Sequence, residues 1–169
     1  GIGTDYYVQN NTSGAFDITI SGGDVTAWSS CTFGTAANDW AATYNGGYVS
    51  SSYWGIGGNA GCDAVRSIEI SGGTVDARGY RGGIGSSCDT NIHDDYEPHP
   101  VPNGSLSILI SGGTVNAVAG DSYDSGGGIG GHLHYNDTRS IIITGDAVVG
   151  AWSGWNESSG YRGHSSIGG

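Results

Sequence analysis

The phrase Ile-x-Ile-(Ser/Thr)-Gly occurs four times along this chain of 169 residues, and a second phrase centred on Ile-Gly alternates with it. A chain that returns to the same short phrases in a fixed order is built from stacked, similar units. Cutting before each Gly-Ile-Gly gives units 1-54, 55-82, 83-127 and 128-165, with a stub at 166-169. Their unequal lengths predict a single repeat domain, 1-169, in which loops of different size leave a common scaffold.

The shortest unit shows the minimal coil. Residues 66–70 alternate with a period of two, as expected for a half-buried strand. The Ser-Gly-Gly of 71–73 predicts a turn at a bend where side chains would crowd. Residues 74–77 predict a second short strand, and the Gly-Ile-Gly of 83–85 a third. Each unit therefore contributes three short strands.

Superposing the units aligns apolar residues into inward-facing columns. The predicted columns are Ile18/Ile68/Ile108/Ile141, Ile20/Ile70/Ile110/Ile143, Val25/Val75/Val115/Val148 and Ile2/Ile56/Ile84/Ile129/Ile167. Helical periodicity is absent, and each of the 34 glycines would cost about 1 kcal/mol inside a helix. We therefore expect an all-β fold, a right-handed parallel β-helix (β-solenoid) of about four coils with long corner loops, because parallel crossovers are nearly always right-handed.

Two of these phrases also carry a resemblance. Ile-Ser-Gly-Gly-Thr-Val-x-Ala, at 70–77 and 110–117, together with the Ile-Gly-Gly segments at 127–131 and 166–169, resembles the Gly-rich β-helix repeats of secreted and cell-surface bacterial proteins. Such repeats occur alongside carbohydrate-active modules. The resemblance implies an architecture but no single activity, since similar β-helices serve as adhesins, glycan-binding modules, glycosidases, lyases and fibre shafts.

Composition narrows the choice of partner and compartment. Five basic residues against 16 acidic ones give a net charge of −11, which disfavours nucleic acid and anionic membranes. No apolar run approaches the roughly 20 residues needed to insert into a bilayer. We expect a secreted or cell-surface protein. If its source glycosylates secreted proteins, N-x-(Ser/Thr) sequons begin at Asn10, Asn11, Asn103, Asn136 and Asn156.

The three cysteines fit an extracellular setting. Cys62 and Cys88 each follow their unit's Gly-Ile-Gly by a few residues. Stacked coils lie about 4.8 Å apart, a spacing that suits a disulfide. We expect a Cys62–Cys88 bridge, with two buried thiols as the alternative. Cys31 lies in a different corner loop, where it would be free or would pair with one of the other two.

One corner, which follows the second strand of each unit, gathers all five tryptophans with tyrosines and arginines. Indole faces match the apolar C–H faces of sugars, and polar side chains supply directional hydrogen bonds to hydroxyls. The alternative is that the aromatic residues anchor a long loop, most plausibly at Trp40 and Trp54. The predicted carbohydrate-binding residues are Trp28, Arg78, Tyr80, Arg81, Tyr123, Trp152, Trp155, Tyr161 and Arg162.

The same corner offers carboxylates for catalysis. A glycosidase needs two of them, about 5–5.5 Å apart for retention or 6.5–9.5 Å for inversion. Asp121, Asp124 and Glu157 come from successive units and could reach either spacing. Against an enzyme, the stack would be only about 20 Å tall. A lyase would use an arginine, because the chain has no lysine.

The other corner, which follows Gly-Ile-Gly, holds histidines amid carboxylates. A divalent metal such as Ca²⁺ is possible here, although no cofactor is required and a solvated acidic loop is the alternative. The predicted metal ligands are His93, Asp94, Asp95, His132 and His134.

From these features we expect a non-catalytic β-solenoid module that binds a glycan or polysaccharide within an extracellular assembly. The alternatives are a glycoside hydrolase or polysaccharide lyase, and a structural subunit of a head-to-tail fibre. For the fibre, no capping segment is legible at either end, so Ile2 of one copy would stack on Ile167 of the next.

Overall fold

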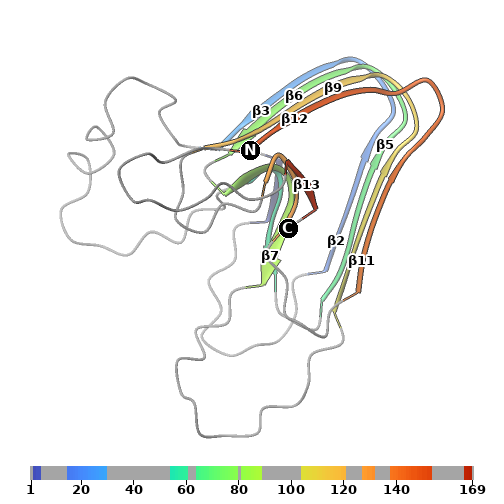
Figure 1. Cartoon of the computed structure of the whole chain (residues 1–169). Coiled ribbons are helices and arrows are strands. Elements are labelled where there is room, and N and C mark those ends of the chain that lie inside the picture. The colour runs from blue at the N-terminus through green and yellow to red at the C-terminus, as the bar shows by residue number, and fades with distance from the viewer. Residues whose placement is uncertain are drawn as a thin grey trace, which may run out of the picture.

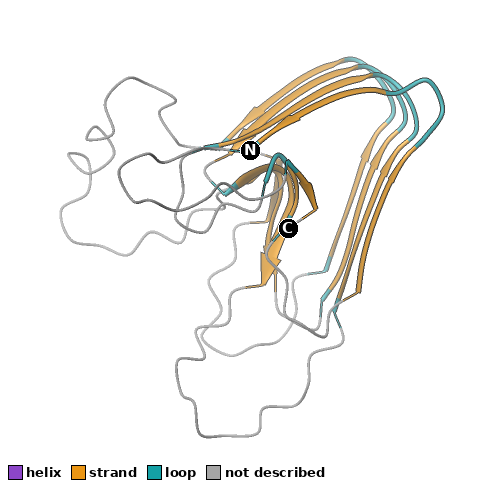
Figure 2. Cartoon of the chain, viewed as in Figure 1, coloured by secondary structure: helices purple, strands orange, loops and turns teal. Residues whose placement is uncertain are grey.

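The protein consists of parallel β-strands. The computed structural model describes residues 2–4, 15–29, 54–60, 64–79, 81–88, 104–120, 127–131, 138–153 and 166–168, and no helix occurs among them. Figures 1 and 2 show the strands gathered into layers and running side by side, joined by short turns on one side. The predicted all-β class is confirmed for this part of the chain.

The strands form three parallel sheets, which we call sheets A, B and C. Sheet A contains β1 (Ile2–Thr4), β4 (Trp54–Ala60), β7 (Gly82–Cys88), β10 (Ile129–Gly130) and β13 (Ile167–Gly168). Sheet B contains β2 (Phe16–Ile20), β5 (Val65–Ile70), β8 (Ser105–Ile110) and β11 (Thr138–Ile143). Sheet C contains β3 (Asp24–Trp28), β6 (Thr74–Gly79), β9 (Thr114–Ala119) and β12 (Val148–Trp152). The chain visits the sheets in the repeating order A, B, C, which is consistent with a β-solenoid.

The strand registers place the repeated isoleucines directly beside one another. In sheet B, Ile68 pairs with Ile18 on one side and with Ile108 on the other, and Ile108 pairs with Ile141. The column from Ile20 through Ile70 and Ile110 to Ile143 has the same register, as does the sheet A column from Ile2 to Ile167. Three of the four predicted columns are therefore confirmed in full.

The fourth column was predicted one residue out of register in its last strand. Val25, Val75 and Val115 stack as expected, but Val115 pairs with Val149, and Val148 pairs with Thr114. The reason is the turn, because four residues (144–147) join β11 to β12 where three join each earlier pair of strands. A shift of one residue reverses the facing of a strand side chain, and Val148 is accordingly 63% exposed.

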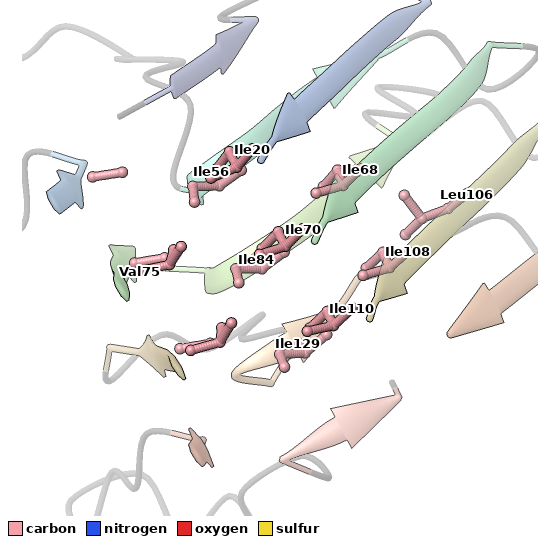
Figure 3. Close-up of a cluster of buried hydrophobic side chains, with 14 residues drawn as sticks. Ile20, Ile56, Ile68, Ile70, Val75, Ile84, Leu106, Ile108, Ile110 and Ile129 are labelled. Carbon is pink, nitrogen blue, oxygen red and sulfur yellow. The ribbon is translucent and has the colours of Figure 1, made fainter. Parts of the chain in front are cut away.

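The inner faces of all three sheets share one hydrophobic core. Sheets A and B contribute isoleucines and Leu106, whereas sheet C contributes smaller valines and alanines. Figure 3 shows Ile56, Ile84 and Ile129 of sheet A in the same cluster as Ile20, Ile70 and Ile110 of sheet B. β-Branched side chains suit this packing because they fit a pleated surface with little loss of rotamer freedom.

Sheet A carries a column of glycines beside its isoleucines. Gly57, Gly85, Gly130 and Gly168 pair in register and have φ angles between 112° and 152°, where L-residues with side chains are strained. A Cβ on Gly85 would lie 1.6 Å from the carbonyl oxygen of Gly130. The glycines of the Gly-Ile-Gly phrase are thus required because one backbone stacks directly on the next.

Candidate functional site on the outer face of sheet C

The outer face of sheet C carries the chemically richest surface among the described residues. In each strand of this sheet the inward valine and alanine alternate with outward positions. Register aligns these positions into three columns: Asp24/Thr74/Thr114/Val148, Thr26/Asp76/Asn116/Gly150 and Trp28/Arg78/Val118/Trp152. Both faces of a parallel sheet are usually covered by other parts of the protein. The outer face of sheet C instead leaves Trp28 and Trp152 exposed, so a ligand can reach it. Figure 1 shows the four strands lying side by side.

Asp76 lies at the centre of a hydrogen-bonded cluster on this face. Arg78 donates through Nε to both carboxylate oxygens at 3.1 Å, and its Nη2 lies 3.0 Å from Oδ2. Asn116 on the neighbouring strand donates through Nδ2 to Oδ1 at 2.6 Å. Trp28 donates through Nε1 to Oδ2 at 3.4 Å. One carboxylate therefore joins side chains from three adjacent strands.

Trp28 is held in place from two directions. Its indole nitrogen is hydrogen-bonded to Asp76, and the guanidinium carbon of Arg78 lies 5.0 Å from the ring centroid, within the range of a cation–π contact. Arg78 therefore contacts both the carboxylate and the aromatic ring. Despite these contacts Trp28 is 54% exposed, so much of the indole remains open to solvent.

Trp152 lies at the other edge of the sheet, in the same column as Trp28. A Cβ on Gly150 would lie 2.3 Å from Cη2 and 2.5 Å from Cζ3 of the Trp152 indole. The ring therefore folds back over Gly150, which belongs to the column of Asp76 and Asn116. Like Trp28, Trp152 is 54% exposed. A larger residue at 150 would push this ring away from the face.

These contacts define a continuous strip across the four strands. We call Trp28, Asp76, Asn116 and Trp152 the strip, with one residue from each of β3, β6, β9 and β12. The indole of Trp28 leans toward Asp76, and the indole of Trp152 covers the position next to Asn116. Three strand spacings separate the two tryptophans, which is about 14 Å. The strip thus has an exposed aromatic group at each end and polar groups between them.

The surroundings of Asp76 set its charge state. Partial burial raises the pKa of this carboxyl, but hydrogen bonds from Arg78, Asn116 and Trp28, together with the positive charge of Arg78, lower it. The net result is a pKa below the ordinary aspartate value. Asp76 is therefore ionised at neutral pH, and its charge is balanced by that of Arg78.

Three of the predicted carbohydrate-binding residues meet on this face: Trp28, Arg78 and Trp152. Arg81 is half-buried just before β7. The remaining predicted residues of this corner lie outside the described part of the chain: Tyr80, Tyr123, Trp155, Tyr161 and Arg162, with the candidate carboxylates Asp121, Asp124 and Glu157.

Trp54, by contrast, has a structural role. It is 1% exposed, and its ring lies against the backbone of Gly82 and Gly85, where a Cβ would come within 2.1 Å and 2.7 Å of Cζ3. Trp54 is therefore buried rather than offered to a ligand, while the loop that it was expected to anchor lies outside the described residues. The glycines opposite it provide the space that the indole fills.

Sequence reasoning did not identify Asp76 and Asn116 as site residues. Both occupy the variable position of the repeated Thr-Val-x-Ala phrase, at residues 74–77 and 114–117. That position faces outward, since the valine and the alanine on either side face the core. The alignment of the units therefore already indicated an outward-facing site position, because a polar residue stands between a valine and an alanine that recur in each unit.

A second feature that sequence reasoning missed is a buried arginine. Arg66 is fully buried in an inner column of sheet B, and it donates through Nε to the Ser105 carbonyl at 3.2 Å and through Nη1 to the Ser86 hydroxyl at 3.4 Å. Two strands away in the same column, Arg139 donates through Nη2 to the Gly131 carbonyl at 2.6 Å. A buried charge is costly without such partners. These groups place positive charge where sheet A meets sheet B.

The remaining predicted sites lie on residues that the structure does not describe. They are the metal ligands His93, Asp94, Asp95, His132 and His134, the sequons at Asn10, Asn11, Asn103, Asn136 and Asn156, and Cys31 and Cys62. Among the described residues, no group of three or more His, Cys, Asp or Glu could hold a metal ion. The backbone of Cys88 pairs with Ala60, so Cys62 is two residues beyond the position opposite Cys88. The disulfide and the metal site stay predictions.

Comparison with known proteins adds no further assignment. No family model, curated protein or solved structure matches this chain. Within the described ranges, no helix has the length and apolar character required to cross a membrane.

Proposed function

We propose that this chain is a right-handed β-solenoid module of about four coils that binds carbohydrate on the outer face of sheet C. The cyclic order of the three parallel sheets supports the solenoid, and the strong preference of parallel crossovers for one hand supports its handedness. The proposal extends to a secreted, non-catalytic protein within a cell-surface or extracellular assembly. The resemblance of the repeated phrases to those of secreted and cell-surface bacterial proteins supports that setting.

The observation that carries this proposal is the pair of exposed tryptophans at the two ends of the strip. Each indole presents a large flat apolar surface, and covering that surface with a ligand is favourable. Flat aromatic faces match the C–H faces of sugar rings. The amide of Asn116 donates one N–H to Asp76 and retains its oxygen and its second N–H for sugar hydroxyls. A strip about 14 Å long suits several linked sugars better than a single ring.

The surface is also preorganised. Trp28 is fixed by Asp76 and Arg78, and Asp76 is fixed by Asn116. Side chains already held in one arrangement lose little conformational entropy on binding. The scaffold beneath them is a close-packed sheet rather than a loop, which keeps the spacing between the two indoles constant.

A glycan array followed by titration of the hits tests the proposal. We expect Trp28→Ala and Trp152→Ala each to weaken binding about tenfold or more, which corresponds to about 1.4 kcal/mol. Ile142→Ala is the matched control, because Ile142 is a similarly exposed apolar residue, 51% exposed, on the outer face of sheet B. Circular dichroism checks that all three variants keep the β fold. An array without hits, or tryptophan variants that bind like the parent, would contradict the proposal.

The head-to-tail fibre, the structural alternative indicated by the sequence, stays a prediction. The exposed tryptophans on the outer face of sheet C favour glycan binding over it.

A further inference from the structure

We infer that the strip selects neutral glycans, and that Asp76 produces this selectivity by neutralising Arg78. This inference rests on the proposed function and concerns the same face. Arginine is the side chain best suited to bind the carboxylate of an acidic sugar, because its planar fork matches two oxygens. Here that fork is directed at a carboxylate of the protein itself, since Nε and Nη2 of Arg78 both contact Asp76.

The charge of the whole face agrees with this inference. Among the outward residues of sheet C, the ionisable side chains are Asp24, Asp76 and Arg78, with a sum of −1. The chain as a whole carries −11. A uronic acid or sulfated sugar would therefore approach a surface of like charge. A neutral sugar meets no such barrier and can use the indoles and the polar groups of the strip.

The geometry also makes Asp76 a positioning residue for the site. Its two oxygens accept hydrogen bonds from Trp28, Arg78 and Asn116, on three neighbouring strands. Asp76→Asn keeps the shape of the side chain but removes its charge. Arg78 would then retain a positive charge beside Trp28 without this counter-charge. The pair formed by residues 76 and 78 would change from neutral to a net positive charge, and an acidic sugar could be accommodated beside Arg78.

The test compares matched oligosaccharides of equal length: those of glucose, mannose and galactose, and those of the corresponding uronic acids. We expect the parent protein to bind a neutral member and to bind its acidic counterpart at least about tenfold more weakly. In Asp76→Asn the ratio of acidic to neutral affinity should rise about tenfold. That gain should shrink in 0.5 M salt, because screening weakens exposed charge pairs.

Asp24→Asn is the control, because it removes one negative charge from the same face. Asp24 is exposed on β3 and lies four residues before Trp28, about 13 Å along the strand. In Asp24→Asn we expect the ratio of acidic to neutral affinity to change by no more than about twofold. Equal effects of Asp76→Asn and Asp24→Asn would overturn the role of Asp76.

The remaining outcomes separate this inference from the function on which it rests. Tighter binding of an acidic oligosaccharide by the parent protein would overturn the neutral selectivity but leave glycan binding intact. Absence of binding to every oligosaccharide would overturn the proposed function itself. Circular dichroism of both variants ensures that a lost signal reports the site and not the fold.

Discussion

Sheets A and C are built on the same repeat, yet they use their residues in opposite ways. In sheet A, glycines stack in register so closely that one backbone touches the next, and a single isoleucine column faces the core. In sheet C, every second residue packs inward and every other one projects outward with a chemically distinct side chain. A side chain at the glycine column of sheet A would clash with the next backbone. The outward positions of sheet C, in contrast, hold side chains of different size and charge.

This difference shows how a repeat scaffold separates folding from function. The backbone contacts of sheet A cannot change without moving the neighbouring strands. The outward positions of sheet C can change without disturbing the core, because valine and alanine on the inner side hold the strand. The proposed binding residues therefore lie on a regular face, at positions that the core leaves unconstrained.

The largest expected effect is in sheet A. Gly85→Ala would place a Cβ 1.6 Å from the Gly130 carbonyl oxygen at a φ of 152°. Neither backbone can move without displacing the next coil, so we expect the free energy of unfolding to fall by more than about 4 kcal/mol. Urea denaturation followed by circular dichroism measures the change.

Gly22→Ala is the matched control for that substitution. Gly22 lies in the turn between β2 and β3, has no positive φ, and has no heavy atom within 4 Å of a built Cβ. We expect stability to stay equal or to rise by about 0.4–1 kcal/mol, because alanine restricts the unfolded chain. Similar losses at both positions would refute the special role of the stacked glycines.

The next largest expected effect is the difference in stability loss between substitutions on the inner and outer faces of sheet C. Val115 and Val118 lie in the same strand, β9, but Val115 is buried in the core and Val118 is half-buried on the outer face. Val115→Ala should lower the free energy of unfolding by about 2 kcal/mol, from lost burial and the cavity left behind. Val118→Ala should change it by less than about 1 kcal/mol. The comparison fails if the outer substitution costs as much as the inner one.

The smallest expected effect concerns the charge of Asp76. Its pKa is lowered in the folded protein, so its ionised form stabilises the fold above the unfolded value of about 3.9, and this stabilisation is lost as the pH falls through the folded pKa. The side chain is 26% exposed, so we expect at most about 1 kcal/mol. Unfolding of the parent and of Asp76→Asn, compared from pH 7 to pH 2, should show a difference that vanishes in acid.

The scaffold was predictable because its signal is local and repeated. Ile68 and Ile70, two residues apart between polar neighbours, indicate a strand with one apolar face, and the same phrase in other units indicates stacking. The position of Val149 was not predictable in this way, because one extra residue in a turn moves a side chain to the other face without changing the apolar pattern around it. The sequence also did not predict that Trp28 would be exposed and Trp54 buried. The burial of Trp54 depends on the glycines that lie opposite it in the neighbouring strand.

The sequence alone determined that β-branched residues would form columns, because a period of two with glycine turns leaves them no other place to be buried. Only the tertiary structure decided that Trp28, Asp76, Asn116 and Trp152 lie on one strip. Consecutive members of the strip are separated by 36 to 48 positions in the chain. Their proximity follows from the register between strands, and the direction in which each indole leans follows from the carboxylate or glycine beside it.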